Sequence, residues 1–432
     1  MKNITTVILA AGSSSRFKHN KSKIFQELSG LSIIEHVYLI ANKVSKNKVI
    51  IVCNKDNINE LKSKFSNVKF VIQTTQKGTA HAILTAKKYL VNRNILILFG
   101  DVPLITFTSI KKLISNFIIS QSKGSMIAFK TDNPLGYGRV ITNGNYVTSV
   151  VEELYASESQ KKIKLCNSGI MVCNANLLFD YINKISNKNI KQESYLPDIF
   201  KILHDIKKSF TYVLGSEEEM LGVNTIEDLI KIDQIYQKKI KDKIIYNGVI
   251  IQQPDTVRLS FDTKIKKGSV IEPFVNIKSG VSIKENVLIK SNSVIESCFI
   301  NSNTSIGPSA RIRPHSKIGK NVKIGNFVEI KNSKIGNNCS ISHLSYIGDS
   351  YLGKDINIGA GTITCNYDGR KKNKTIIRDG VFVGSNCSLV APITIGKNST
   401  IGAGSVITNN IPSNHLALER SEVKILRKQR KK

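Results

Sequence analysis

The stretch IGPSARIRPHSKIGKNVKIGNFVEI, residues 306–330, repeats one six-residue pattern. An isoleucine returns at every sixth position, at 306, 312, 318, 324 and 330. The residue two positions before each later isoleucine is small or apolar, and the residue between them is charged. Such alternation is typical of a β-strand, and the Gly, Pro and Asn residues that follow favour a bend. Each hexad therefore predicts one short strand and one corner.

The same period extends over most of the second half of the chain, with occasional slips of one residue. Aliphatic residues also occupy positions 265, 271, 277, 283, 289, 295, 300, 335, 341, 347, 352, 358, 383, 389, 395, 401 and 407. Hexapeptide repeats of this length are the sequence signature of a parallel β-helix. Because one coil cannot bury its own interior, the core forms only when coils stack. We therefore predict a hexapeptide β-helix domain over residues 248–432.

The first half of the chain has a different texture. Apolar runs such as KVIIVC (48–53) and NILILFG (94–100) alternate with amphipathic stretches such as LSIIEHVYLIANKV (31–44). This alternation predicts an α/β domain over residues 1–226, Rossmann-like, with a mostly parallel sheet covered by helices on both faces. The spacing of apolar residues in TIEDLIKIDQIYQKKIKDKI (225–244) predicts a linker helix at 227–247.

Composition excludes several classes of protein. No apolar run approaches the roughly 20 residues of a membrane helix, so we expect no membrane partner. The apolar start of the chain reads as a first strand rather than a signal peptide, because it is β-branched and ends in a Gly/Ser turn. The seven cysteines form no CxxC pair, which favours reduced thiols in the cytoplasm without zinc or disulfides.

The formal net charge of +31 would attract polyphosphate chains. The lysines are nevertheless scattered through both halves, and no basic stripe studded with aromatic residues accompanies them. The one dense basic run, KILRKQRKK (424–432), is interpreted as a solvated tail. We therefore expect no nucleic-acid partner.

Two motifs of the first half could bind a nucleotide. LAAGSSSRF (9–17) is a strand-to-helix turn whose backbone N–H groups could hold phosphate oxygens, with Arg16 and Lys23 adding charge. Taken alone, it is also consistent with an ordinary tight turn. In ILFGDVPL (97–104), Asp101 ends an apolar strand, where a carboxylate could hold Mg²⁺ against phosphates or simply cap a helix.

These motifs, with QKGTAHA, NPLGYGRV, VVEE, NSGI and GVN in this order, resemble the bifunctional bacterial N-acetylglucosamine-1-phosphate uridyltransferase/glucosamine-1-phosphate N-acetyltransferase family. The motifs ARIRP, GNFVEIK, SHLSYIGD, NIGAGTITCNYDG and VFVGS are more specific, because other hexapeptide proteins share the ladder but not these departures. The resemblance covers nearly the whole chain. It implies a left-handed β-helix, Mg²⁺ as the metal, and UTP and acetyl-coenzyme A as co-substrates.

The resemblance implies a nucleotide and sugar site in the first domain. The residues implied to bind the nucleotide or UDP-N-acetylglucosamine are Leu9, Ala10, Ala11, Gly12, Arg16, Lys23, Gln73, Gly78, Thr79, Phe99, Gly100, Asp101, Gly138, Glu152, Asn167 and Asn224. Of these, Asp101 and Asn224 are implied to hold Mg²⁺. The sugar phosphate is expected to attack the α-phosphorus of UTP, so positioning and charge neutralisation carry the catalysis.

This chain departs from the family pattern in three places. Ser14 and Ser15 replace the usual Gly and Thr, and Lys21 and Ser22 replace Leu-Pro. After Glu152 comes ELYAS, where a Lys and an Asp are expected. These changes concern the phosphate loop and part of the sugar site, and they leave the implied metal ligands intact.

In the second domain, two cations are predicted to stack. If three hexads close one turn, Arg313 and Lys331 lie one coil apart, about 4.8 Å from each other. A bound sugar phosphate would explain why two cations stack. Tyr346 then falls on the next coil of the same face, with His343 at that face's other corner. On its own, a corner histidine is more often a solvated turn residue.

The resemblance assigns His343 as the general base that takes a proton from the glucosamine amine as it attacks acetyl-coenzyme A. The residues implied to bind the sugar phosphate are Arg313, Lys331, Tyr346 and Asn357, and those implied to bind acetyl-coenzyme A are Ala360, Ser385, Ala403 and Arg420. Asn366 and Tyr367 are implied to contact the sugar or the acetyl-coenzyme A. Sites of this family lie between the β-helices of a homotrimer, and the stretch 359–382 is expected to loop outward beside them.

Two other functions fit the same domain plan. A sugar-1-phosphate nucleotidyltransferase with a purely regulatory or oligomerising hexapeptide domain would lack the constellation around His343. A scaffold or translation-factor subunit would tolerate the loss of Asp101 or Asn224. All of these residues are present, which favours the bifunctional enzyme.

Overall fold

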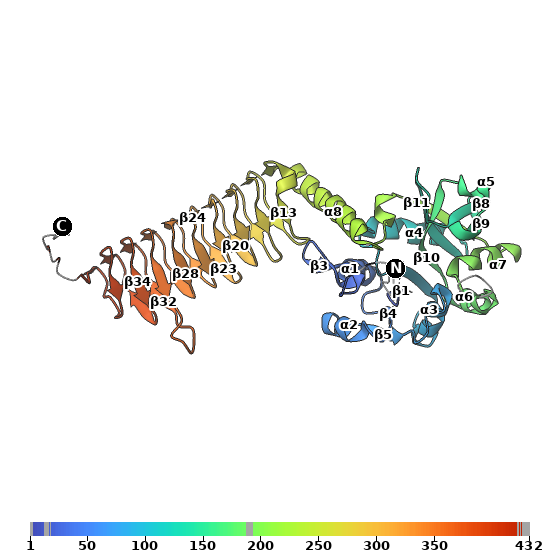
Figure 1. The fold of residues 1–432 in the computed structure, drawn as a ribbon, viewed down its shortest axis with the longest axis horizontal. Helices are drawn as coiled ribbons and strands as arrows, with labels where there is room; N and C mark the ends of the chain where they lie inside the picture. The colour runs from blue at the N-terminus through green and yellow to red at the C-terminus, as the bar shows by residue number, and fades with distance from the viewer. Residues whose placement is uncertain are drawn as a thin grey trace, which may run out of the picture. The chain divides into compact units, whose positions relative to one another are not determined.

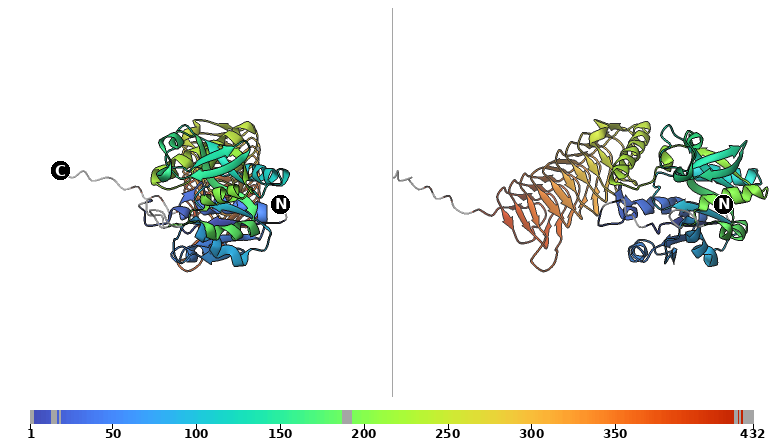
Figure 2. Two further views of the ribbon diagram at one scale, coloured as in Figure 1. Left: turned by 90° about the vertical axis from the view of Figure 1, so that its right-hand side faces the viewer. Right: turned by 45° about the vertical axis from the view of Figure 1, so that its right-hand side comes forward.

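The computed structural model describes residues 3–12, 17, 19–186, 193–420, 423 and 425. The chain forms two compact units, Met1–Tyr236 and Gln237–Lys432. Figure 1 and Figure 2 show the first as an α/β unit and the second as a stack of short-stranded coils. Within the described ranges, none of the helices combines the length and the apolar character that a membrane-spanning segment requires.

One mixed sheet forms the centre of the first unit, with strand order β5-β4-β1-β6-β10-β7-β11-β9-β8. β9 and β10 run against the common direction of the other strands. The strands are β1 (Ile4–Leu9), β4 (Val49–Cys53), β5 (Lys69–Ile72), β6 (Asn94–Phe99), β7 (Gly124–Lys130), β8 (Arg139–Asn143), β9 (Tyr146–Val151), β10 (Leu165–Asn174) and β11 (Phe210–Gly215). The sequence did not predict that β10 is reversed inside the sheet, because a strand buried on both faces reads the same in either direction.

Helices cover both faces of this sheet, as the apolar strands predicted. One core packs α3 (Thr79–Ala86), α6 (Ala175–Tyr181) and α7 (Ile199–Asp205) against one face, and the other packs α1 (Ile33–Ser45), α2 (Ile58–Lys64) and α4 (Phe107–Ile119) against the opposite face. Val7 of β1 belongs to the first core and Ile8 to the second, as the alternation of a strand requires.

In the second unit, the described residues form three parallel sheets, and the chain visits them in turn. The first sheet consists of β12 (Ile250–Ile251), β15 (Val270–Ile271), β18 (Leu288–Ile289), β21 (Ser305–Ile306), β24 (Lys323–Asn326), β27 (Ser340–His343), β30 (Asn357–Ile358), β33 (Phe382–Val383), β36 (Thr400–Ile401) and β38 (Leu416–Ala417).

The second sheet consists of β13 (Arg258–Leu259), β16 (Asn276–Ile277), β19 (Val294–Ile295), β22 (Arg311–Ile312), β25 (Glu329–Lys331), β28 (Tyr346–Gly348), β31 (Ile363–Cys365), β34 (Ser388–Val390) and β37 (Val406–Ile407). The third consists of β14 (Lys264–Ile265), β17 (Ser282–Ile283), β20 (Cys298–Ile300), β23 (Ser316–Ile318), β26 (Lys334–Ile335), β29 (Ser350–Leu352), β32 (Thr375–Ile377) and β35 (Ile393–Ile395). This architecture is the predicted parallel β-helix.

The ladder residues predicted from the hexad period are buried along the axis of this unit. At one corner, Asn286, Asn303, Asn321 and Asn338 repeat with φ between 56° and 59°. Asn tolerates this left-handed conformation better than other residues with a side chain, and the amides hydrogen-bond from coil to coil. The asparagine content of this half therefore has a structural reason.

The outward loop is shorter than the predicted 359–382. The ladder continues through β31, where Thr362 and Thr364 point inward and are fully buried, while Ile363 is 45% exposed. The Thr362 hydroxyl donates to the Gly359 carbonyl across 2.8 Å, which makes a buried threonine acceptable. Between β31 and β32 the chain leaves the stack, and Figure 1 and Figure 2 show this loop projecting from the coils. The sequence placed this strand in the predicted loop because its inward residues are threonines rather than aliphatic residues.

The helix α8 (Ile226–Tyr246) runs across the division between the units. Ile232 lies in a core cluster of the first unit, and Ile244 lies in the core of the β-helix. In the second unit, the Gln237 amide donates to the Leu259 carbonyl across 2.7 Å and accepts from the Leu259 N–H across 3.1 Å. The C-terminal part of α8 therefore covers the first coil of the β-helix.

Candidate functional site

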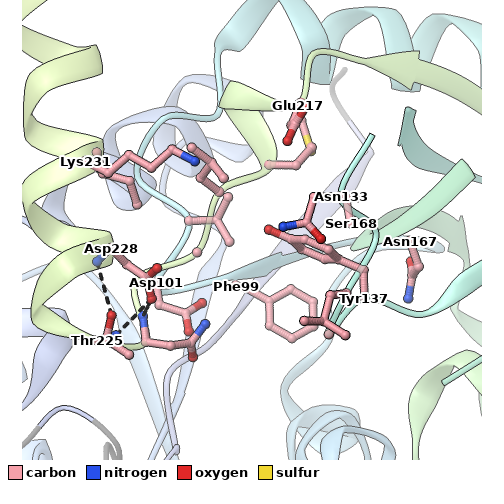
Figure 3. Close-up of a pocket in the computed structure, with 18 residues that line it drawn as sticks. Phe99, Asp101, Asn133, Tyr137, Asn167, Ser168, Glu217, Thr225, Asp228 and Lys231 are labelled. Atoms are coloured by element: carbon pink, nitrogen blue, oxygen red, sulfur yellow. Dashed lines mark hydrogen bonds between the residues drawn. The ribbon is translucent and has the colours of Figure 1, made fainter. Parts of the chain in front are cut away.

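Three adjoining cavities of the first unit share Phe99 in their walls, and Figure 3 shows one of them. Predicted residues that line the first are Leu9, Ala10, Ala11, Gly12, Lys23, Gln73, Gly78, Thr79, Phe99 and Asp101. Gly138, Glu152 and Asn167 line the second, and Asn224 lines the third with Asp101. Arg16, Ser14 and Ser15 lie outside the described residues.

Side-chain amides hold the loop that follows β1. The buried Asn57 donates to the Ala10 carbonyl across 2.8 Å, and Gln76 donates to the Ala11 carbonyl across 2.9 Å. Gly100 donates its N–H to the Leu9 carbonyl across 2.9 Å, which joins the ends of β1 and β6. These bonds fix the loop backbone at the carboxyl ends of parallel strands, where α/β sheets bind ligands.

Gly78 is required by a close approach of two chain segments. Its φ is 91°, and an added Cβ would lie 2.4 Å from the Ser194 carbonyl oxygen. The next residue, Thr79, accepts the Leu196 N–H at its hydroxyl across 2.9 Å. The start of α3 is thereby tied to the segment that brings Tyr195 into the cavity wall. Burial, with Glu193 nearby, raises the pKa of Tyr195 to about 12, so its hydroxyl stays neutral.

Lys23, Asp101 and Asn224 meet at the junction of these cavities, although they are far apart in sequence. The Lys23 ammonium donates to the Asp101 carboxylate across 2.6 Å and to the Asn224 side-chain oxygen across 3.1 Å. Asn224 is held by its backbone N–H, which donates to the Asp228 carboxylate across 2.9 Å. The two predicted metal ligands therefore converge on one cation.

The third cavity extends the site along the start of α8. Figure 3 shows Asp101, Thr225 and Asp228 on one side of it and Tyr137 and Asn167 on the other. Burial raises the pKa of Tyr137, and the negative charge of Asp228 adds to this effect. Sequence reasoning gave no role to these wall residues other than Asp101 and Asn167.

The implied sugar residues Gly138, Glu152 and Asn167 line one cavity. A Cβ on Gly138 would lie 3.4 Å from a carboxylate oxygen of Glu152, and the Gly138 carbonyl accepts the Asn167 N–H across 2.8 Å. The divergent sequence after Glu152 forms the short helix η4 (Glu153–Tyr155), and Glu153 pairs with the buried Arg139 across 2.6 Å. That ion pair fixes the turn beside Glu152, so the departure leaves the cavity formed.

In the second unit, one column of side chains follows the corner between the first and second sheets. The strand register and the coil-to-coil backbone hydrogen bonds place one residue of each successive coil in this column. These residues are Asn326, His343, Ala360, Ser385 and Ala403. The last three are small and continue directly from His343. An extended ligand could therefore lie along the corner for roughly 14 Å and end at the histidine.

Arg313 and Lys331 are one coil apart, as predicted, because β22 and β25 pair in register. A third cation, Lys372 from the loop after β31, lies beside Lys331. The pKa of Lys331 is lowered because the Lys372 ammonium adjoins it, and burial and Arg313 act in the same direction. The Glu329 carboxylate accepts a hydrogen bond from the Arg313 guanidinium across 2.8 Å, and this bond raises the pKa of Arg313. The three cations form a charged clamp, which is suited to a phosphate dianion.

Tyr346 stacks on Glu329 in the second sheet, between the clamp and the His343 corner. The Asn366 amide lies 3.5 Å from the Tyr346 hydroxyl and donates to the Asp349 carboxylate. Tyr367 follows in the loop and is exposed. These contacts join the start of the loop to the second sheet.

Of the residues predicted for the sugar phosphate, Asn357 lies apart from this face. Asn357 belongs to the first sheet, paired with Ser340 and Phe382, and therefore projects from another side of the coil than Tyr346. Arg420 reaches back to the last coils, where its guanidinium lies 3.5 Å from the Cβ position of Gly402, next to Ala403.

Sequence reasoning assigned no role to Lys372, Glu329, Asp349 or Asn326, although all four stand in the quoted motifs or next to them. Lys372 belongs to the run RKKNK, in which nothing local distinguishes one lysine from another. Glu329 could have been found from its register, since it lies one coil after Arg311 on the outward face.

The fold and these two sites define a nucleotidyltransferase joined to a hexapeptide-repeat transferase. The family model of the MobA-like NTP transferase domain matches residues 6–164, and that of the bacterial transferase hexapeptide (six repeats) matches residues 262–297 and 374–409. The model of the GMPPB C-terminal domain matches residues 294–367.

Full-length relatives make the assignment specific. The bifunctional protein GlmU of Bartonella bacilliformis is 37% identical over 98% of this chain and 95% of the relative. That of Buchnera aphidicola subsp. Acyrthosiphon pisum is 40% identical over 98% and 96%, and that of Agrobacterium fabrum is 36% identical over 97% and 93%. The chain belongs to the GlmU family of bifunctional enzymes. Its activities are uridyl transfer and glucosamine-1-phosphate acetyl transfer, which together make UDP-N-acetylglucosamine from glucosamine-1-phosphate, acetyl-coenzyme A and UTP.

Proposed function

We propose that uridyl transfer takes place in the joined cavities of the first unit and acetyl transfer on the second-sheet face of the β-helix. The observation that carries this proposal is the column that runs from His343 along the small residues of one corner, beside a clamp of three cations. A purely regulatory β-helix has no use for cations stacked along the sheet that begins at the His343 corner.

In the first unit, the loop after β1 and the Gly78 turn would hold the nucleotide, with Gly138, Glu152 and Asn167 around the sugar. The sugar phosphate oxygen forms a bond to the α-phosphorus of UTP, the bond from that phosphorus to the bridging oxygen breaks, and pyrophosphate leaves. Lys23 would neutralise negative charge on the phosphates, since its ammonium reaches the meeting point of the cavities.

Asp101 and Asn224 fit Mg²⁺. Both offer hard oxygen ligands, and both already lie within hydrogen-bond distance of one cation, the Lys23 ammonium. Among the described residues, no group of three His, Cys, Asp or Glu could hold a metal, so an ion here would keep water or phosphate oxygens as its other ligands. When bound, Mg²⁺ would neutralise charge that develops on the phosphate oxygens.

In the second unit, Arg313, Lys331 and Lys372 would hold the phosphate of glucosamine-1-phosphate, and acetyl-coenzyme A would lie along Ala360, Ser385 and Ala403. The amine nitrogen bonds to the acetyl carbonyl carbon as His343 accepts the amine proton at Nε2. The carbon–sulfur bond then breaks, and coenzyme A leaves as a thiolate that takes up a proton.

A homotrimer would complete this site. Asn357 and Tyr346 project from different sheets of one chain, so a sugar site that uses both needs one of them from a second copy. Phe327 and Leu344, at the same corner as His343, are 60% and 63% exposed in left-handed conformations that bulky residues rarely adopt. A second copy packed on this corner would cover them.

A coupled assay tests both activities in one sample. The enzyme is given glucosamine-1-phosphate, acetyl-coenzyme A, UTP and Mg²⁺, and free thiol and pyrophosphate are followed together. We expect both to be released, with pyrophosphate dependent on prior acetylation. The proposal for the β-helix is wrong if the enzyme releases pyrophosphate when N-acetylglucosamine-1-phosphate is supplied directly but releases no thiol from acetyl-coenzyme A with glucosamine-1-phosphate. The free cysteines support a cytoplasmic location.

A further inference from the structure

Asn326 and His343 are the last residues of β24 and β27, and the register of these strands places them directly one above the other. The Nδ1 atom of the His343 ring lies 2.5 Å from the Oδ1 atom of Asn326. An amide oxygen can only accept, so this contact is a hydrogen bond when His343 carries its hydrogen on Nδ1 and donates it. In a neutral imidazole, the lone pair then lies on Nε2.

This hydrogen bond determines what the ring can do. Within the described part of the chain, it is the one side-chain hydrogen bond that His343 makes. The position of Asn326 is fixed in turn, because its backbone carbonyl accepts the N–H of Leu344 across 3.1 Å. Two hydrogen bonds therefore join Asn326 to the corner that carries His343, one from the imidazole and one from the Leu344 backbone N–H.

We propose that Asn326 is a positioning residue for acetyl transfer, which holds His343 in the Nδ1–H tautomer and leaves Nε2 ready to accept the amine proton. The inference rests on the proposed role of His343 as the base. It gives a function to the asparagine of the GNFVEIK motif, for which the sequence offered none.

A purely structural role for Asn326 predicts different results. Asparagine amides also link the coils at another corner, as from Asn321 to Asn338 across 3.0 Å, and such a bond contributes to stability alone. Loss of a structural bond would change the unfolding transition and leave the turnover of folded enzyme unchanged. Loss of a positioning bond would lower kcat with little change in KM.

The first experiment compares Asn326→Ala and Asn326→Asp with Asn276→Ala, a control in the outward face of β16, in the full-length enzyme. We expect the alanine variant to lose on the order of 10-fold in kcat for acetyl transfer, part of the roughly 10²- to 10⁴-fold that a general base supplies. Its KM for glucosamine-1-phosphate should stay within about two-fold, because the clamp is untouched. The aspartate variant should recover most of the rate, since a carboxylate accepts the same hydrogen.

The second experiment reads the tautomer directly, by ¹⁵N NMR of histidine-labelled enzyme with the His343 signals assigned from their loss in His343→Asn. The parent should carry its hydrogen on Nδ1, and Asn326→Ala should shift the population toward Nε2–H. The inference is overturned if the alanine variant acetylates within two-fold of the parent, if the aspartate variant is equally slow, or if the tautomer does not change. Full acetylation by His343→Asn would instead refute the proposed base.

Discussion

Lys23 and Asp101, 78 residues apart in sequence, are joined by a hydrogen bond of 2.6 Å from ammonium to carboxylate. The same ammonium lies 3.1 Å from the side-chain oxygen of Asn224. The two oxygens proposed to hold Mg²⁺ thus already form a cation site built from separate segments of the first unit. The negative charge of Asp101 is therefore central to this site.

Asp101→Asn should lower uridyl transfer by roughly 10²- to 10³-fold, because an amide no longer supplies the negative charge that holds a cation at the phosphates. Acetyl transfer should stay within about two-fold, since the β-helix has a core of its own. Pyrophosphate and thiol release are measured separately, with Asp132→Asn, an exposed carboxylate paired with Lys164, as the control. Equal loss of both activities in a folded variant would contradict separate sites.

His343→Asn should lower acetyl transfer by roughly 10²- to 10⁴-fold, the usual contribution of a positioned base. Uridyl transfer from supplied N-acetylglucosamine-1-phosphate should not change. The control is His415→Asn, which removes another exposed histidine of the β-helix, one whose ring bonds to the Ser413 carbonyl. If both variants acetylate like the parent, His343 is only a corner residue.

Lys372→Ala should raise the KM for glucosamine-1-phosphate by about 10-fold, since it removes one charge-assisted contact to the phosphate. The control is Lys371→Ala, in the same loop. A KM that rises equally in both variants would point to general surface charge rather than to the clamp.

The clamp also predicts a pH dependence for binding of the sugar phosphate. The pKa of Lys331 is lowered, chiefly by the adjacent Lys372 ammonium, so Lys331 loses its charge at a lower pH than an ordinary lysine near 10.4. Affinity for the sugar phosphate should therefore weaken on the alkaline side, beginning below the usual titration of lysine. Calorimetric titration at a series of pH values measures this affinity in the parent and in Lys372→Ala. In the variant, the affinity should begin to decline at a higher pH.

Asn357→Ala and His343→Asn should complement each other when the two chains are expressed together. Each variant alone should acetylate poorly, but mixed trimers would contain some sites with an intact Asn357 from one copy and an intact His343 from another. Acetyl transfer well above the sum of the separate variants is expected. Activity no greater than that sum, in mixed assemblies verified by native mass spectrometry, would show that one chain supplies both residues.

Of the seven cysteines, all of them in the described part of the chain, Cys365 alone is not buried. Burial raises the pKa of Cys53 to about 11 and that of Cys173 to about 12, which suppresses their thiolates. We expect one thiol per native chain to react rapidly with an aromatic disulfide reagent, and Cys365→Ser to abolish that phase. Rapid labelling of several thiols in native enzyme would contradict this burial.

The sequence determined the class of both units because their signals are local. The spacing of apolar residues that distinguishes a strand from a helix is visible within a few neighbouring residues. The hexad ladder repeats the same inward position in coil after coil. The stacking of Arg313 on Lys331 could be counted from the period alone, because each coil returns the chain to the same face.

Only the tertiary structure decided which residues meet across the fold. The reversal of β10, the meeting of Lys23 with Asn224, and the approach of Lys372 to Lys331 depend on segments that no local pattern relates. Thr362 and Thr364 continue the ladder because their hydroxyls find backbone carbonyls, and such partners are not readable from residue type. Likewise, the hexad motif pointed to His343, but only the structure shows that the Asn326 side chain lies 2.5 Å from its ring.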